Sequence, residues 1–246
     1  MRIDLNADVG ESYGDWRTDD ATILRSVTSA SVACGGHTGD AASMRRTVDL
    51  AAENGVSIGA HVSYADPEGF GRRAVQVGAV ELAGQLGAQL AALQEVARAA
   101  GALVRYVKPH GALYGTRDAD HASAVVRVVA DAGLPVVALP RGEIARQAAA
   151  AGLRVVGEAF LDRGYLADGT LVPRTEAGAI LHDVDEVCAR AVSLVRDRNV
   201  VAVSGERIAV AAETLCLHGD TDGAASLLAT VRVALEAAGV EVGAFV

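Results

Sequence analysis

The hydrophobic pattern along the chain alternates between two periods. Short apolar runs of strand length occur at 2–6, 28–33, 56–60, 103–107, 135–139, 154–157, 200–203 and 213–217. Longer Ala- and Leu-rich stretches with helical spacing lie between them, at 40–54, 80–100, 119–132, 142–151, 183–197 and 222–238. Because strands and helices alternate from end to end, the pattern predicts parallel strands joined by right-handed crossovers.

The stretch 80–100 has the clearest helical period. Leu82, Leu86 and Leu90 recur every fourth residue and continue into Leu93, so they form one apolar stripe. The segment 158–182, in contrast, fits neither the helical nor the strand period. We therefore expect it to be a long functional loop.

The chain has the length of a single α/β barrel. Its 246 residues contain no Pro/Ser-rich linker, no charge block and no clear sequence repeat. We predict an α/β fold with one catalytic domain over 1–246. A distorted or incomplete (β/α) barrel is favoured over a doubly wound open sheet.

Composition excludes several classes of protein. The chain is 51% hydrophobic and 22% charged, which suits a packed core and excludes disorder. Its net charge of −9 gives no basic surface for nucleic acid or anionic lipid, and no apolar stretch is long enough to span a membrane. The opening residues, MRIDLNADVGE, do not resemble a signal peptide, and the three cysteines include no C-x-x-C. We expect a cytoplasmic protein with no nucleic-acid or membrane partner.

Histidines follow four of the predicted strands. Taken singly, each of them is explained as a polar loop residue bound by backbone groups. Parallel strands, however, place their carboxyl ends on one face, which carries the active site in such folds. The first strand adds polar residues at the same end. The converging set is His37, His61, His110 and His218, with Asp4, Asn6, Asp8 and Glu11.

Lys108 is the only lysine in a chain whose other basic residues, 21 of the 22, are arginines. It ends a predicted strand and directly precedes Pro109 and His110. An ammonium is a compact point charge, which can act on a phosphate or carbonyl oxygen or titrate when desolvated. The alternative is that composition drift left one lysine behind.

Two further segments carry charges suited to an anionic ligand. The sequence GFGRR places Arg72 and Arg73 after a glycine-rich turn, where they can bind a carboxylate or phosphate or remain solvated. EAFLDRGY places Glu158, Asp162 and Arg163 after another strand, with Glu158 expected to face the site.

Common catalytic motifs are absent from the sequence. There is no G-x-x-x-x-G-K-[ST], no G-x-G-x-x-G before a helix and no G-x-S-x-G. Cys34 and Cys216 lie near His37 and His218, but their spacing matches no structural zinc pattern. We therefore expect both cysteines to be small buried residues at strand ends. The residues by themselves indicate a carboxylate/His/Lys site that is either hydrolytic or metal-dependent.

The ordered motifs resemble those of the LamB/YcsF family, whose members are A subunits of ATP-dependent 5-oxoprolinases. The matching blocks are DLNADVGE, ACGGHTGD, GAHVSYAD, FGRR, VKPHGALY, EAFLDRGYLADGTLVPR and TLCLHGD, spread over nearly the whole chain. Ser31, Gly36 and Val62 depart from the family pattern, which usually has Asn, Phe and Pro there. These departures affect the local shape of the pocket, because the histidines and acids are retained.

The resemblance implies a fold like the glycoside hydrolase/deacetylase barrels. It also implies a hydrolase that acts on a cyclic amide C–N bond together with two partner subunits, B and C. Together they open 5-oxo-L-proline, a small lactam, to L-glutamate while ATP is hydrolysed to ADP and phosphate. ATP, with Mg²⁺, would bind at or through the partner subunits. Self-association of the chain is left open.

Roles follow from the resemblance and the converging residues. The expected catalytic group is Asp8, His37, His61, Lys108, His110 and His218. The expected substrate-binding group is Asn6, Glu11, Asp40, Arg72, Arg73, Glu158, Asp162 and Arg163.

One alternative is a metal-dependent amidohydrolase or deacetylase that needs no ATP and uses Asp8, His61 and His110 as ligands. Another is a non-catalytic substrate-binding subunit. Whether the chain binds a divalent metal stays open, and the lack of a compact H-x-x-x-H pair favours the metal-free version.

Overall fold

The described strands form a closed parallel barrel. The computed structural model describes residues 1–12, 18–219 and 223–246. Seven strands of this part pair in the order β1 (Arg2–Val9), β2 (Ser29–Ala33), β3 (Ser57–Val62), β4 (Val104–Pro109), β5 (Val136–Ala138), β6 (Val155–Phe160) and β9 (Thr214–Cys216). β9 pairs with both β6 and β1, and this pairing closes the ring. The predicted α/β barrel is therefore confirmed.

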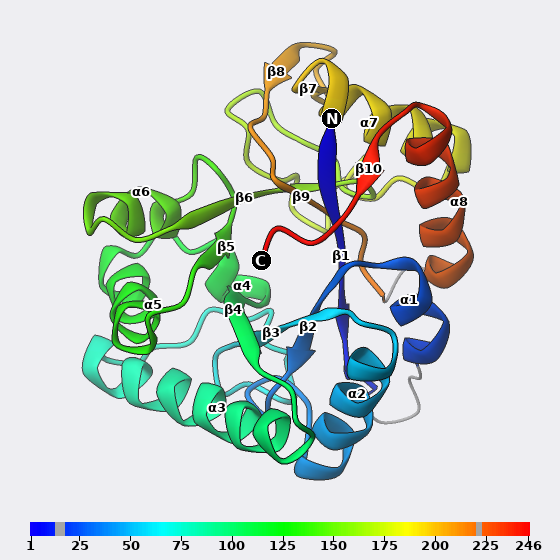
Figure 1. Ribbon diagram of the computed structural model, residues 1–246. Helices are drawn as coiled ribbons and strands as arrows, with labels where there is room; N and C mark the ends of the chain where they lie inside the picture. Colours follow the sequence, from blue (N-terminus) through cyan, green and yellow to red (C-terminus); the bar gives the residue numbers. More distant parts are fainter. Residues whose placement is uncertain (13–17, 220–222) are drawn as a thin grey trace.

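Helices surround the barrel (Figure 1). They are α1 (Asp20–Ser26), α2 (Ala41–Glu53), α3 (Ala79–Ala99), α5 (Ala119–Ala132), α6 (Glu143–Ala150), α7 (Val184–Arg196) and α8 (Ala224–Ala237), with the short α4 (Gly111–Tyr114) directly after β4. The predicted apolar stripe of α3 is buried, since Leu82, Leu86 and Leu93 have no exposed surface. Burying one face of each helix against the strands is the main source of stability in such a fold.

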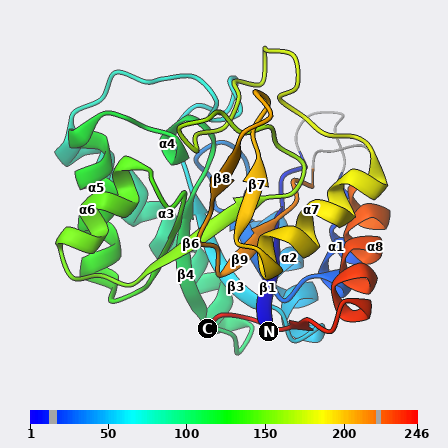
Figure 2. The same cartoon turned by 90° about the horizontal axis from the view of Figure 1, so that it is seen from above.

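The two chain termini lie at the same end of the barrel, opposite the long loops (Figure 2). There β10 (Glu241–Val242) pairs with Arg2 and Ile3 at the start of β1. The last residues continue inward, and the ring of Phe245 packs 5.1 Å from that of Tyr106. This apolar floor leaves the carboxyl ends of the strands as the polar end of the barrel.

One predicted barrel strand was wrong. Residues 200–203 overlap β7 (Asn199–Val201), which pairs antiparallel with β8 (Arg207–Ala209) in a separate two-stranded sheet. Val200 is buried, but Val201 and Val203 are exposed, so the run is apolar without being a buried strand. Hydrophobicity alone could not distinguish a partly exposed hairpin strand from a buried barrel strand.

Other element boundaries also differ from the prediction. β6 was expected to end at 157 but continues to Phe160, because Glu158 and Phe160 pair with Thr214 and Cys216 of β9. The sequence pattern did not predict α1, α4, β8 or β10, each of which has at most seven residues. Residue 222 of the helix predicted over 222–238 lies outside the described residues, and α8 begins at Ala224.

The segment that follows β6 forms no helix and no extended strand before α7, as predicted for 158–182, except that residues 158–160 belong to β6. Isolated bridges join Arg163 to Ile180 and Tyr165 to Leu171. The buried hydroxyl of Tyr165 accepts a 2.7 Å hydrogen bond from the backbone N–H of Phe160. The loop is therefore anchored to the barrel. No helix in the described part of the chain is long and apolar enough to cross a membrane.

Candidate active site

Lys108 lies at the centre of the polar end of the barrel. Its Nζ is 2.8 Å from Asp8 Oδ1 and 2.9 Å from Glu158 Oε1, and it also contacts Asn6 Oδ1 at 3.3 Å and Cys216 Sγ at 3.2 Å. Burial opposes the charged form of Lys108, but neighbouring negative charge, led by Asp8, outweighs burial and holds the pKa well above its usual value. The barrel therefore contains a buried ammonium between two carboxylates.

A layer of hydrogen bonds below Lys108 fixes these partners. Asn6 Nδ2 donates to Glu158 Oε1 at 2.9 Å and to the Thr214 hydroxyl at 2.6 Å. The Thr214 hydroxyl in turn donates to the Asp4 carboxylate, which accepts two further hydroxyl bonds at 2.6 and 2.7 Å. Burial raises the pKa of Asp4. Asn6 and Glu158 are thus positioned by the fold itself.

Asp8 and His61 form a carboxylate–imidazole pair. Asp8 Oδ2 lies 3.3 Å from His61 Nε2, and His61 Nδ1 is 3.0 Å from the carbonyl oxygen of Lys108. Burial opposes ionisation of Asp8, but the charges of His61 and Lys108 bring its pKa well below the usual value. Burial likewise opposes protonation of His61, yet the charge of Asp8 raises its pKa. Such a pair is suited to moving a proton.

A second cluster surrounds Glu11. Its Oε1 lies 2.9 Å from His37 Nε2, 3.3 Å from His110 Nδ1 and 3.7 Å from His61 Nε2. The four atoms all lie within 4.8 Å of one another, which is close enough to hold a metal ion together. The rings of His37 and His110 stack at 3.7 Å, and that of His61 is edge-on to both. Burial lowers the pKa of His37 to about 4 and also lowers that of His110, which favours the neutral form of both rings.

His218 and Asp162 form a third polar group. His218 Nδ1 is 3.0 Å from Asp162 Oδ1, and the backbone N–H of His218 donates to Asp162 Oδ2. The imidazole stacks on the ring of Phe160 at 5.0 Å. This contact and the Asp162 carboxylate fix the orientation of the ring.

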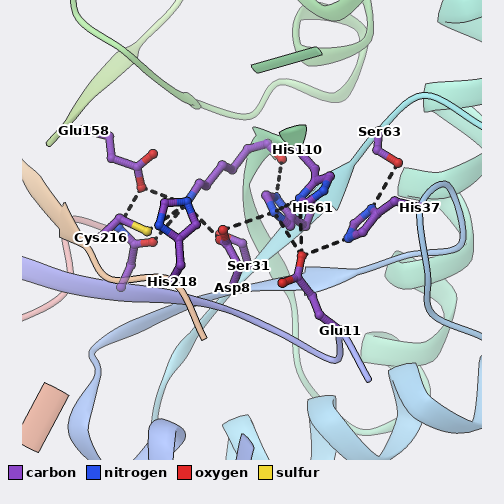
Figure 3. A network of polar contacts seen from close by, with 12 residues as sticks. Asp8, Glu11, Ser31, His37, His61, Ser63, His110, Glu158, Cys216 and His218 are labelled. Carbon is purple, nitrogen blue, oxygen red and sulfur yellow. Dashed lines mark hydrogen bonds and ion pairs between the residues drawn. The ribbon is translucent and has the colours of Figure 1, made fainter. Parts of the chain in front are cut away.

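The three groups form one continuous row at the end of the barrel. Figure 3 shows it running from Glu158, Cys216 and His218 through Asp8 to Glu11, His61 and His110, and on to His37 and Ser63. A pocket of about 590 Å³ opens over this row. Its polar lining includes Asp8, Glu11, His61, Arg72, Lys108, His110, Tyr114, Arg163, Arg174 and His218. Residues from six separate sequence blocks therefore meet at one cavity.

Most of the predicted site residues lie in this row or in the lining of the pocket, but Arg73 and Asp40 are not part of that lining. Arg73 pairs with Asp66, and its side chain is 60% exposed. Asp40 is the N-cap of α2, where it accepts a 2.7 Å hydrogen bond from the backbone N–H of Ser43. These contacts give both residues local structural roles.

The two arginines in the lining differ in how they are held. Arg163 is buried and donates to the carbonyl oxygens of Ala179 and Val172 at 3.0 and 2.6 Å, which ties the guanidinium to the loop after β6. Arg72 lies with its guanidinium carbon 5.1 Å from the ring centre of Phe70. Together they bring positive charge to the pocket wall.

Several residues of the site did not emerge from the sequence. Tyr114 and Arg174 line the pocket, and Thr214 holds Asn6 beneath it. Ser63 Oγ is 3.1 Å from His37 Nδ1, and its backbone is bound by Gln89 of α3 through two hydrogen bonds. The signal for Gln89 was available, because it is a polar residue among the buried leucines of an apolar helix face.

Comparisons with known proteins agree with this geometry. Residues 3–246 match the LamB/YcsF family. The chain is 57% identical to a protein of Streptomyces avermitilis named as the A subunit of 5-oxoprolinase, over 99% of both chains. It is 50% identical to one of the same name from Paracidovorax citrulli, over the whole of both. A crystal structure of a lactam utilization protein from Thermus thermophilus superposes with a TM-score of 0.94, at 42% identity and full coverage of both chains.

A more distant likeness concerns the fold alone. A family 4 carbohydrate esterase from Streptomyces lividans has a TM-score of 0.54 at 14% identity, covering all of this chain and 93% of that one. The expected deacetylase-like barrel is thus confirmed as a fold.

Proposed function

The chain belongs to the LamB/YcsF family, and from this we propose that it is the A subunit of an ATP-dependent 5-oxoprolinase. The assembled enzyme would open 5-oxo-L-proline to L-glutamate while it hydrolyses ATP to ADP and phosphate. The observation that carries the proposal is the identity of 48 to 57% over essentially the full length to proteins that bear this 5-oxoprolinase name. The term subunit in these names also supports the partner subunits B and C.

The chemistry of a lactam explains why ATP would be needed. An unactivated amide carbon is a poor electrophile, and transfer of a phosphoryl group to the lactam oxygen makes it reactive toward water. Water attack then requires a base, and departure of the ring nitrogen requires an acid. The C–N bond breaks to leave an acyl phosphate, which a second water hydrolyses to the glutamate carboxylate and free phosphate. The sequence contains no glycine-rich phosphate loop. We therefore assign ATP and Mg²⁺ to the partner subunits, and the hydrolytic step to this chain.

The pocket offers groups for both proton transfers. Asp8, ionised and paired with His61, is our candidate for the base that activates water. His218, oriented by Asp162, is our candidate for the acid that protonates the leaving nitrogen. Both residues line the same pocket, so a ligand bound there can meet both.

Other lining residues suit the charges of the substrate. 5-Oxoproline carries a carboxylate, and its activated form would also carry a phosphate. Arg72, Arg163 and Arg174 supply guanidinium groups, which bind such anions well. Burial, together with the charge of Glu158, raises the pKa of Tyr114, so its hydroxyl stays a hydrogen-bond donor.

The geometry also refines the role of Lys108. Its three N–H donors already face Asp8, Glu158, Asn6 and Cys216, so it reaches a substrate oxygen only by exchanging one of these contacts. We propose that its main function is to hold Asp8 ionised and in place. Because Lys108 lines the pocket, its positive charge also acts on a bound substrate.

A metal-dependent amidohydrolase that needs no ATP is the second candidate. The observation that favours it is the cluster of Glu11, His37, His61 and His110, because this donor set is typical of a metal site. A metal in this place is also compatible with the ATP-dependent reaction, so the two candidates differ in their need for ATP.

A reconstitution assay tests the proposal. The purified chain is mixed with both partner subunits, 5-oxo-L-proline, ATP and Mg²⁺, and glutamate and ADP are measured while each component is omitted in turn. Product should form only in the complete mixture. Glutamate release by this chain without ATP would instead identify a simple amidohydrolase. A complete mixture that opens another lactam but not 5-oxoproline would refute the substrate.

A further inference from the structure

We propose that Glu11, His37, His61 and His110 bind one divalent transition-metal ion of the zinc type beside the pocket. This ligand set differs from the one suggested by the sequence, since Glu11 and His37 join His61 and His110 within 4.8 Å of one another. Asp8 is not in this group: its Oδ1 pairs with Lys108, and its Oδ2 lies 3.3 Å from His61 Nε2. The inference rests on the arrangement of donor atoms and does not depend on the substrate or on ATP.

The first step concerns which ring nitrogens carry protons. His61 Nδ1 faces the carbonyl oxygen of Lys108 at 3.0 Å, and His110 Nε2 faces that of Phe70 at 2.9 Å. A carbonyl oxygen only accepts, so these nitrogens are the protonated ones. The remaining nitrogens, His61 Nε2 and His110 Nδ1, lie 3.0 Å apart. In neutral rings both present lone pairs to each other.

His37 follows the same pattern through Ser63. The Ser63 hydroxyl donates to the carbonyl oxygen of Tyr64 at 2.9 Å, so it accepts from His37 Nδ1 at 3.1 Å. His37 Nε2 is then the unprotonated nitrogen, and it faces Glu11 Oε1 at 2.9 Å. Each of the three histidines is thus held by a hydrogen bond on its outer nitrogen, as is usual for metal ligands.

The second step concerns charge. Four acceptor atoms without protons converge, and such an arrangement is unfavourable unless a positive charge lies among them. Within the described part of the chain, the groups that contact the Glu11 carboxylate are the three imidazoles, with no lysine or arginine. A metal ion supplies the missing charge. A second proton on one imidazole is the competing explanation, and His61 is the ring concerned, because its Nε2 also faces Asp8 Oδ2 at 3.3 Å.

The third step concerns the chemical class of the ion. Four of the six separations among the donor atoms, those from Glu11 Oε1 to the three ring nitrogens and that between His61 Nε2 and His110 Nδ1, run from 2.9 to 3.7 Å, and the other two are within 4.8 Å. Ligands about 2.0–2.1 Å from a tetrahedral zinc ion lie about 3.4 Å apart, which falls within that range. Three imidazoles and one carboxylate favour zinc or a neighbouring first-row ion over Mg²⁺ or Ca²⁺, which prefer oxygen ligands. Glu11, His61 and His110 line the pocket, so a bound ion would be accessible to a ligand.

Metal binding by the free chain tests this assignment. The chain is prepared without a histidine tag, stripped with a chelator, and titrated calorimetrically with ZnCl₂, with MgCl₂ as the comparison. We expect one equivalent of Zn²⁺ to bind and to raise the melting temperature, with Mg²⁺ giving no such effect. Glu11→Gln and His110→Gln should each weaken binding by at least about 100-fold, and Ser63→Ala by about 10–100-fold. His182→Ala removes an imidazole elsewhere, outside the lining of the pocket, and should bind as the wild type does.

The ligand set is also visible without any substitution. X-ray absorption of the zinc-loaded wild type should show only nitrogen and oxygen neighbours, including imidazole scattering, so the test stands even if a variant fails to fold. Sulfur neighbours, the absence of stoichiometric binding, or unchanged affinity in folded Glu11→Gln and His110→Gln proteins would overturn the assignment. The last two results would leave a proton on an imidazole as the explanation of the cluster.

Discussion

The ammonium of Lys108 lies 2.8 Å from Oδ1 of Asp8, although 100 positions separate the two residues in sequence. Glu158 approaches the same ammonium at 2.9 Å from a third strand. A lysine fits here because its compact, tetrahedral head directs donors to several acceptors at once, whereas a planar guanidinium needs more room. The single lysine of the chain therefore occupies a place that arginine does not fill.

Lys108→Arg should be nearly as damaging as Lys108→Ala. The guanidinium is too large for the buried space among Asp8, Glu158 and Asn6, so conserving the charge does not conserve the geometry. We expect each variant to lower turnover in the assembled enzyme by about 10²–10³-fold. Steady-state glutamate formation measures this. A stable Lys108→Arg protein with wild-type turnover would show that the position needs only a positive charge.

Lys108→Met should also destabilise the fold, by about 3–5 kcal/mol at pH 7, because it leaves buried carboxylates without their partner. The pKa of Asp8 is held low by His61 and Lys108, so in the variant it rises and the carboxylate gains a proton more easily. The loss of stability should therefore shrink as the pH is lowered. Urea unfolding at several pH values measures it, and a loss that does not vary with pH would contradict this account.

Thr214→Val should destabilise the protein by about 1–3 kcal/mol, although it conserves the shape of the side chain. The hydroxyl of Thr214 joins Asp4 to Asn6, and its loss takes the hydroxyl donor from buried Asp4 Oδ2 and removes one of the two hydrogen bonds that Asn6 Nδ2 donates. Thr230→Val is the matched control, because Thr230 is exposed on α8. Equal unfolding free energies for the two variants would show that the buried network contributes nothing.

Gly36→Ala should disturb the support of His37. A Cβ on Gly36 would overlap Ser63 Oγ and lie 2.6 Å from Gln89 Oε1, so the serine that binds His37 Nδ1 would have to move. We expect a lower melting temperature. Gly84→Ala in α3 is the control, since nothing lies within 4 Å of its Cβ, and it should stabilise by about 0.5–1 kcal/mol. Two variants of equal stability would contradict the close packing around Ser63.

The cysteines should differ sharply in reactivity. Burial raises the pKa of Cys34 to about 12, so at pH 8 only about one thiol in 10⁴ is ionised, and burial raises that of Cys216 as well. Cys188 is partly exposed. In the native protein, a thiol reagent should titrate Cys188 alone, and all three after denaturation. Cys188→Ser should abolish the native reaction, and rapid labelling of Cys34 would disprove the burial.

Much of the barrel was predictable because its strands are short, apolar and separated by long amphipathic helices. The histidines could be grouped in advance because parallel strands share one carboxyl end, and the structure does bring His37, His61 and His110 together. The prediction of a barrel strand at 200–203 was wrong for a physical reason, because an exposed hairpin and a buried strand can contain the same apolar residues.

The details of the site depend on side-chain geometry that sequence does not encode locally. Asp40 was expected in the substrate-binding group, but it is the N-cap of α2, and helix capping accounts for it. Glu158 was expected at a strand end, whereas pairing with β9 places it inside the strand and against Lys108. Asp8 and the Glu11 cluster are joined through His61, whose Nε2 lies 3.3 Å from Asp8 Oδ2 and 3.7 Å from Glu11 Oε1, a contact that no local sequence pattern predicts.

The central claim is that this chain carries out the hydrolytic step of lactam opening. Asp8→Asn tests it most directly, because the amide keeps the shape of the carboxylate but cannot act as a base. The variant is assembled with both partner subunits, assembly is verified by gel filtration, and glutamate formation from 5-oxo-L-proline and ATP is measured. We predict a fall of about 10²–10⁴-fold in an intact complex. Glutamate formation at the wild-type rate would contradict the account and would place the hydrolytic site elsewhere in the complex.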